Sequence, residues 1–254
     1  MKSVNLQKND YYNETALLDT FMARTYKDNN LIQGHSHRIF QRRDSLFSAG
    51  DVFEGVYILR SGSAKAFITS REGEEHITKF YYPGDMIGMD GFDVGMQTQS
   101  VRFLETSSVC LINTSQVNSL LSTNKGFRDG LLQSMSHSLT SDSAMMMCLS
   151  TCSSEQKVAR FLLDLSIGFS ERGLSGGEFI LSMTRTDIAS YLGMAIETVS
   201  RIFASFQERQ LIAVQQRFLT ILDFAALNQC VSIDVCANTA DNRSRLKKSK
   251  QTMN

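Results

Sequence analysis

Residues 184–207 read Thr-Arg-Thr-Asp-Ile-Ala-Ser-Tyr-Leu-Gly-Met-Ala-Ile-Glu-Thr-Val-Ser-Arg-Ile-Phe-Ala-Ser-Phe-Gln. Thr184 suits the N-cap of a helix whose third residue is Asp187, the pairing of a capping box. Gly193 tolerates the positive φ of a tight turn, so that helix ends at Gly193-Met194-Ala195. A second helical pattern starts immediately afterwards. Two helices joined by so short a turn predict a helix-turn-helix.

The second helix of this motif has two distinct faces. Three- and four-residue spacing predicts an inner face of Ile196, Val199, Ile202, Phe203 and Phe206. Its first turns therefore project Glu197, Thr198, Ser200 and Arg201 outward. These positions meet base edges when such a helix enters the major groove, where arginine suits guanine and glutamate suits the amino group of cytosine. The alternative is a helical hairpin used for protein contacts.

The flanking sequence completes a compact unit around the motif. Ser153 and Gln156 form a capping start for an upstream helix. A short strand is expected at 179–181. Residues 211–214 and 218–221 then form a hairpin of the winged type.

Short strands punctuated by glycine fill residues 45–112. The expected strands are 56–59, 64–68 and 76–80, with turns at Ser61-Gly62 and at residues 71–74. Pro83-Gly84-Asp85 adds a further turn. Turns every 8–12 residues or so are typical of an antiparallel barrel or jelly roll.

Residues 115–150 predict a long helix with a narrow apolar seam. The seam follows heptad spacing with one polar member, Asp142, and comprises Leu132, Met135, Leu139, Asp142, Met146 and Leu149. Such a seam favours a parallel homodimer, in which two Asp142 carboxylates would face each other and weaken association. The alternatives are a helix lying on its own barrel, and an Asp142 that simply reaches solvent at the edge of the seam.

Composition narrows the class of protein. The chain has 254 residues, 26 basic and 26 acidic side chains and five cysteines. It has no long uncharged apolar stretch and no apolar block near Met1, so we expect a cytoplasmic location, no membrane contact and reduced thiols. No nucleophile–base cluster, phosphate-binding glycine loop or paired metal motif is visible, which argues against an enzyme.

Positions 31–228 resemble the CRP/FNR family of bacterial transcription regulators, in particular its FNR-like branch. The matching stretches are Leu46–Asp51, Arg60-Ser61-Gly62, Pro83–Gly88, Leu104–Ser107, Met183-Thr184-Arg185, Tyr191-Leu192-Gly193 and Glu197–Arg201. The resemblance implies an α+β fold with a sensory barrel, a dimerisation helix and a winged helix-turn-helix. It also implies that Glu197, Ser200 and Arg201 read a TTGAT half-site. Thr198, Arg185 and Thr184 complete the expected DNA-binding set.

The expected organisation has five parts: an extension (1–30), the barrel (31–114), the dimerisation helix (115–152), the winged helix-turn-helix (153–228) and a polar, basic, disordered tail (229–254). The alternative for the tail is a segment that contacts the DNA backbone. Double-stranded DNA is the expected partner. RNA polymerase would touch the barrel hairpin around Gly73-Glu74, as the resemblance implies. The alternative function is a module that binds a cyclic nucleotide or another small ligand and acts on a protein partner.

We expect no cofactor, because the sequence departs from the family's two standard effectors. An iron–sulfur cluster needs four thiolates, but no cysteine precedes Cys110. A cyclic nucleotide needs an arginine for its phosphate, and Arg102 is displaced by several residues from that position. A redox or metal role for Cys148 and Cys152, and haem ligation by His35 or His37, remain weaker alternatives.

Overall fold

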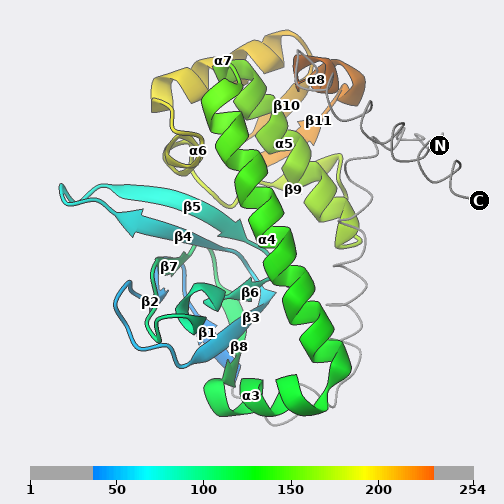
Figure 1. Cartoon of the computed structure of the whole chain (residues 1–254). Helices are drawn as coiled ribbons and strands as arrows, with labels where there is room; N and C mark the ends of the chain where they lie inside the picture. Colours follow the sequence, from blue (N-terminus) through cyan, green and yellow to red (C-terminus); the bar gives the residue numbers. More distant parts are fainter. Residues whose placement is uncertain (1–36, 232–254) are drawn as a thin grey trace, which may run out of the picture.

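A computed structural model describes residues 37–231 (Figure 1). Its first part contains two four-stranded antiparallel sheets that pack face to face. One sheet has the order β1 (His37–Phe40), β8 (Ser107–Asn113), β3 (Gly55–Ser61) and β6 (Met86–Ile87), and the other has the order β2 (Ser45–Phe47), β7 (Ser100–Phe103), β4 (Ala64–Thr69) and β5 (Glu75–Tyr81). A 3-10 turn, η1 (Met89–Phe92), follows β6. The expected barrel is therefore a jelly-roll-like pair of sheets that do not close into one cylinder.

The three strands predicted between glycine-containing turns correspond to β3, β4 and β5. The core between the sheets includes Tyr57 and Leu59 from one sheet and Val101 and Phe103 from the other. At the predicted turn after β3, Gly62 has a φ of +84°, and a Cβ there would collide with Ser107. Only glycine fits this turn without strain.

Two helices occupy the segment that was expected to form one. They are α3 (Thr114–Thr123) and α4 (Lys125–Thr151). Asn124 separates them, because its extended backbone ends α3 while its side chain accepts a hydrogen bond from Phe127 N and so caps α4. In Figure 1 α4 runs along the molecule from α3 to the carboxyl-terminal unit.

The carboxyl-terminal unit is a winged helix-turn-helix. It contains α5 (Ser154–Glu171), β9 (Glu178–Ile180), α6 (Arg185–Leu192), α7 (Ile196–Glu208), β10 (Ile212–Gln215), β11 (Phe218–Ile221) and α8 (Phe224–Val231). The wing pairs β10 with β11, and β9 adds to the other side of β11. Helix α8 extends three residues beyond position 228; the rest of the expected tail, and the expected extension, lie outside the described residues.

The two units share one apolar core. Phe67, Ile77, Phe80 and Leu104 of the first unit belong to the same buried cluster as α5, α6 and α7. In Figure 1 the β4–β5 hairpin lies next to α6. Within residues 37–231, no helix is long and apolar enough to cross a membrane.

Candidate nucleic-acid interface

The start of α6 has the capping box that the sequence predicts. Asp187 N donates to Thr184 Oγ1 (3.1 Å), and Thr184 N donates to Asp187 Oδ2 (2.8 Å). At the other end Gly193 has a φ of +60°. The turn between the helices is therefore fixed by local chemistry, because left-handed backbone is disfavoured for residues with a Cβ.

The inner face of α7 anchors the second helix to the unit. Val199, Phe203 and Phe206 are buried, and Ile202 is partly buried. The prediction for Ile196 was wrong: this first residue of α7 is 39% exposed, since it lies at the end of the helix beyond the packed surface. The buried aromatic pair is enough to set which side of α7 faces outward.

Three of the predicted reading residues lie on the outer face of α7. Glu197, Ser200 and Arg201 are exposed, and Thr198 is half-buried. Within residues 37–231, the side chains of the three exposed residues make no hydrogen bond or ion pair. A carboxylate, a hydroxyl and a guanidinium are thus available together for an external partner.

Thr184 and Arg185 have clear roles within the protein. The Thr184 hydroxyl donates to Asp187 Oδ2 at 2.7 Å, although the residue is exposed. The Arg185 guanidinium lies 3.6 Å from the centroid of the Phe203 ring, and burial lowers the pKa of Arg185. Arg185 therefore stacks against the inner side of α7.

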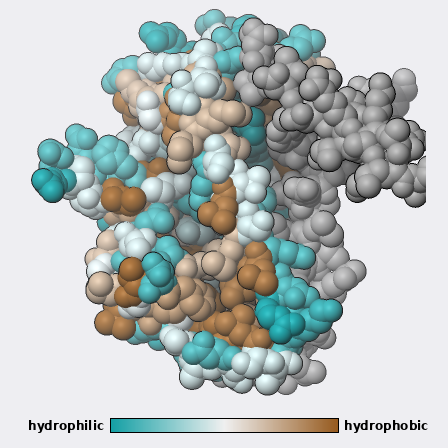
Figure 2. Space-filling model, viewed as in Figure 1, coloured by the Kyte–Doolittle hydropathy of each residue, from teal (hydrophilic) through white to brown (hydrophobic). Residues whose placement is uncertain are grey.

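The six predicted seam residues all lie on α4 and are exposed in the single chain. Leu139 and Met146 are 70% and 72% exposed. The others are Leu132, Met135, Asp142 and Leu149. Figure 2 shows apolar side chains interspersed with polar ones on the face of the molecule that α4 crosses.

The residues in the first unit do not fit the family's two standard effectors. Cys110 is fully buried on β8, and no three His, Cys, Asp or Glu side chains within residues 37–231 converge as metal ligands. Arg102 Nη1 contacts Glu75 Oε1 at 2.6 Å, and its guanidinium stacks on the Phe67 ring. This arginine is engaged in the protein's own contacts, so a cyclic phosphate would lack that cation.

The remaining effector candidates give no ligand set. Cys148 is buried and Cys152 half-buried at the end of α4; burial and a hydrogen bond with Cys152 raise the pKa of the Cys148 thiol to about 11. Cys110, Cys148, Cys152 and Cys230 are free thiols. His37 lies within hydrogen-bonding distance of Arg60 Nη1. Cys236 and His35 lie outside the described residues.

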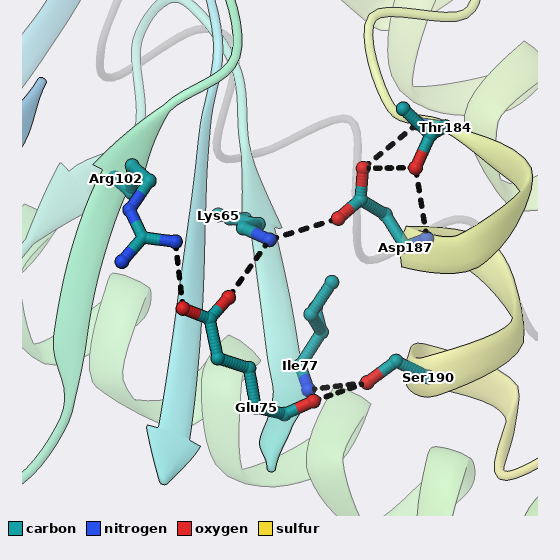
Figure 3. A network of polar contacts seen from close by, with 7 residues as sticks. All are labelled: Lys65, Glu75, Ile77, Arg102, Thr184, Asp187 and Ser190. Carbon is teal, nitrogen blue, oxygen red and sulfur yellow. Dashed lines mark hydrogen bonds and ion pairs between the residues drawn. The ribbon is translucent and has the colours of Figure 1, made fainter. Parts of the chain in front are cut away.

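Sequence reasoning missed the residues that connect the helix-turn-helix to the first unit. Lys65 Nζ lies 2.8 Å from Asp187 Oδ1 (Figure 3). The two residues are 122 positions apart. Local patterning identified Asp187 as a cap, but it gives no signal for such a distant partner.

Two family models match the chain. The model described as "Cyclic nucleotide-binding domain" matches residues 37–124, and "Crp-like helix-turn-helix domain" matches residues 156–230. The transcriptional activator protein Anr of Pseudomonas protegens is 40% identical over 73% of this chain and 76% of its own length. The fumarate and nitrate reduction regulatory protein of Vibrio cholerae is 36% identical over 76% of this chain and 77% of its own length.

A solved structure supports the fold. FixK2 from Bradyrhizobium japonicum superposes with a TM-score of 0.71 at 20% sequence identity, covering 79% of this chain and 99% of that one. At that identity the likeness concerns the arrangement of helices and strands alone.

Proposed function

Because this chain belongs to the CRP/FNR family of transcription regulators, on its FNR-like side, we propose that it binds TTGAT-type inverted repeats as a homodimer. Its relatives are regulators and not enzymes, and its carboxyl-terminal unit is a helix-turn-helix DNA-binding domain. The proposal concerns the sequence that is read, the residues that read it and the dimeric state. Thr198, Thr184 and Arg185 belong to the proposed DNA-binding set, with Thr184 and Arg185 acting at the edge of the interface.

The observation that carries the proposal is the outer face of α7. Glu197, Ser200 and Arg201 lie on its first turns and are exposed, while Phe203 and Phe206 hold the opposite face in the core. A helix presented in this way suits the major groove. Arginine supplies two parallel donors for guanine, and glutamate accepts from the amino group of cytosine.

The exposed apolar seam of α4 supports a second copy of the chain as the other half of the assembly. Side chains such as Leu139 and Met146 would leave water in a parallel pairing of two α4 helices. A two-fold dimer then presents two α7 helices to two half-sites, which accounts for inverted repeats spaced by about one helical turn.

Activation of transcription is the proposed outcome. Relatives such as Anr of Pseudomonas protegens carry the name transcriptional activator. The turn at Gly73-Glu74 between β4 and β5 is exposed at the end of its hairpin and is available to RNA polymerase.

Arg201→Ala tests the DNA-reading role. We expect it to weaken binding to a duplex with TTGAT inverted repeats by about 1–3 kcal/mol, roughly 5- to 150-fold, and to relax the preference at the contacted guanine. Fluorescence anisotropy with operator and scrambled duplexes measures both effects.

The matched control is Arg209→Ala, which removes the same charge from the carboxyl end of α7, where Arg209 pairs with Glu155. It should leave the sequence preference unchanged. Wild-type protein that binds operator and scrambled duplexes equally would refute sequence-specific reading and would favour the alternative, a ligand-binding module acting on a protein partner.

A further inference from the structure

A polar network joins the β4–β5 hairpin to the helix-turn-helix (Figure 3). Lys65 of β4 contacts two carboxylates, with Nζ 2.8 Å from Asp187 Oδ1 and 3.2 Å from Glu75 Oε2. Arg102 of β7 holds the other oxygen of Glu75 at 2.6 Å. The network therefore runs from the sheet of the first unit, through Lys65, into α6.

Ser190 of α6 makes a second set of contacts with the same hairpin. Ile77 N donates to Ser190 Oγ (3.0 Å), and Ser190 Oγ donates to the Glu75 carbonyl oxygen (2.9 Å). Strand β5 is the edge of its sheet, so its outward backbone groups have no neighbouring strand. The serine hydroxyl takes the place of that strand for one donor and one acceptor.

Burial makes the ion pair between Lys65 and Asp187 costly to break. The side chains of Lys65 and Asp187 are only 12% and 11% exposed. Removing one partner of such a pair leaves a charge that water cannot fully solvate. Surface ion pairs contribute little to stability, but this one is largely shielded from solvent.

The network ends in the cap of α6. Asp187 uses Oδ1 for Lys65 and Oδ2 for Thr184, so one carboxylate joins the hairpin to the first turn of the helix. Alongside it, the Phe80 ring of β5 packs on Tyr191 of α6, with centroids 5.2 Å apart. Helix α6 is thus held by polar and apolar contacts on the side that faces the hairpin.

We propose that Lys65 is a positioning residue for DNA binding: it fixes α6 on the edge of β5, and through α6 it sets the orientation of α7. We call the contacts of Lys65, Glu75 and Ile77 of the hairpin with Asp187 and Ser190 of α6 the hairpin latch. This inference rests on the proposed DNA-reading function. It makes the β4–β5 hairpin the route by which the first unit controls operator affinity.

The latch favours the DNA-binding orientation. It engages Asp187 and Ser190, whereas Glu197, Ser200 and Arg201 stay exposed on α7. Two half-sites can be occupied together only if both α7 helices keep a fixed orientation relative to the dimer. Loosening the latch therefore lowers affinity for the inverted repeat more than affinity for a single half-site.

Lys65→Met, with Lys65→Arg as the conservative variant, tests the inference. Lys125→Met is the control, because Lys125 is an exposed lysine at the start of α4. Hydrogen exchange followed by mass spectrometry reports the mobility of α6 without DNA. Anisotropy with full and half operator duplexes reports the effect on binding.

We expect Lys65→Met to speed exchange in α6 and to weaken binding to the full operator roughly tenfold, the effect of losing one modest contact. Half-site affinity should change far less. Lys65→Arg should restore both readouts, and Lys125→Met should leave both unchanged. Ser190→Ala, which loosens the latch without stranding a charge, should act in the same direction if Lys65→Met fails to fold.

Unchanged exchange in α6 in Lys65→Met and Ser190→Ala would overturn the latch. Equal losses for full and half operators would also overturn it, because they would indicate general damage to α7. If wild-type protein shows no preference for the operator, the proposed function fails, while the exchange measurement still decides whether the latch holds α6.

Discussion

Arg185 and Arg201 show how neighbouring arginines of one motif differ in role. Arg201 is exposed, whereas Arg185 lies 3.6 Å from the Phe203 ring centroid and is half-buried. Both belong to the DNA-binding set that we propose. The structure adds a packing contribution for Arg185, because a guanidinium over an aromatic ring gains more as it loses water.

Arg185→Ala should lower the free energy of unfolding by about 0.5–2 kcal/mol, the range for a desolvating cation–π contact. Arg201→Ala, an exposed substitution on the next helix, should stay within about 0.5 kcal/mol of the wild type. Urea unfolding of both variants measures the difference. Equal losses of stability would contradict the packing role of Arg185.

Residues whose conformation depends on near neighbours could be predicted from the sequence. The capping pair Thr184 and Asp187, and the left-handed Gly193, follow from local hydrogen bonding and steric limits. The contact between Lys65 and Asp187 could not be predicted, because it depends on how two units that are distant in the sequence pack against each other. The spacing of residues along the chain does not show how the two units pack.

At the scale of elements, α4 is a 27-residue helix whose seam has no partner within the described chain. The heptad spacing of this seam could be predicted from the sequence. The break between α3 and α4 could not be predicted, because asparagine also occurs within helices. Only the structure shows that the Asn124 side chain accepts a hydrogen bond from Phe127 N and so caps α4. A single capping residue in a helical pattern gives little warning of a break.

Substitution of Asp142 tests whether the seam of α4 forms a dimer interface. Asp142→Ala should raise the dimer fraction at a given concentration, by about fivefold in the association constant for a gain near 1 kcal/mol, because two facing carboxylates no longer repel. Sedimentation velocity across a dilution series measures this constant. Ser141→Ala provides a control for helix propensity on the adjacent, exposed residue.

An association constant for Asp142→Ala that equals the wild-type value would exclude Asp142 as a control point. A chain that stays monomeric in both forms would instead exclude the α4 seam as an interface. In that case the single-chain arrangement of α4 would be the functional one.

At the scale of the whole molecule, the hairpin latch gives the two units a shared response to acid. Burial alone raises the pKa values of Glu75 and Asp187, but hydrogen bonds from Arg102 to Glu75 and from Lys65 to both outweigh it, and Thr184 adds to the effect at Asp187. The pKa of each carboxyl therefore lies below its ordinary value. The unfolded chain binds more protons than the folded one in this range, so stability falls as the pH drops.

We expect the stabilisation from these carboxylates to be complete at neutral pH and to be lost below about pH 5, as the pH falls through their lowered pKa values. Glu75→Gln should flatten the acid side of the stability curve relative to the wild type. Urea midpoints at a series of pH values provide the measurement. Parallel curves for both proteins would show that Glu75 does not contribute to the acid response.

The helix-turn-helix follows from the sequence because its cap and its turn depend on neighbouring residues. The fold class follows from the spacing of short strands and from the family resemblance, although the sheets themselves pair distant strands such as β1 with β8. The relation between the units depends on long-range contacts such as Phe80 with Tyr191 and Arg172 with Asp85. These pairs join segments that are more than 80 positions apart. Each of these four residues, taken alone in the sequence, looks like an ordinary core or surface residue and gives no sign of its distant partner.

The length of α4 has a mechanical consequence. At 27 residues it spans about 40 Å, so a pivot of about five degrees at its α3 end sweeps the far end through roughly 3.5 Å. That displacement is close to the rise of one base-pair step in duplex DNA, about 3.4 Å. A tilt of a few degrees at the α3 end would therefore displace the other end of α4 by about the length of one base-pair step.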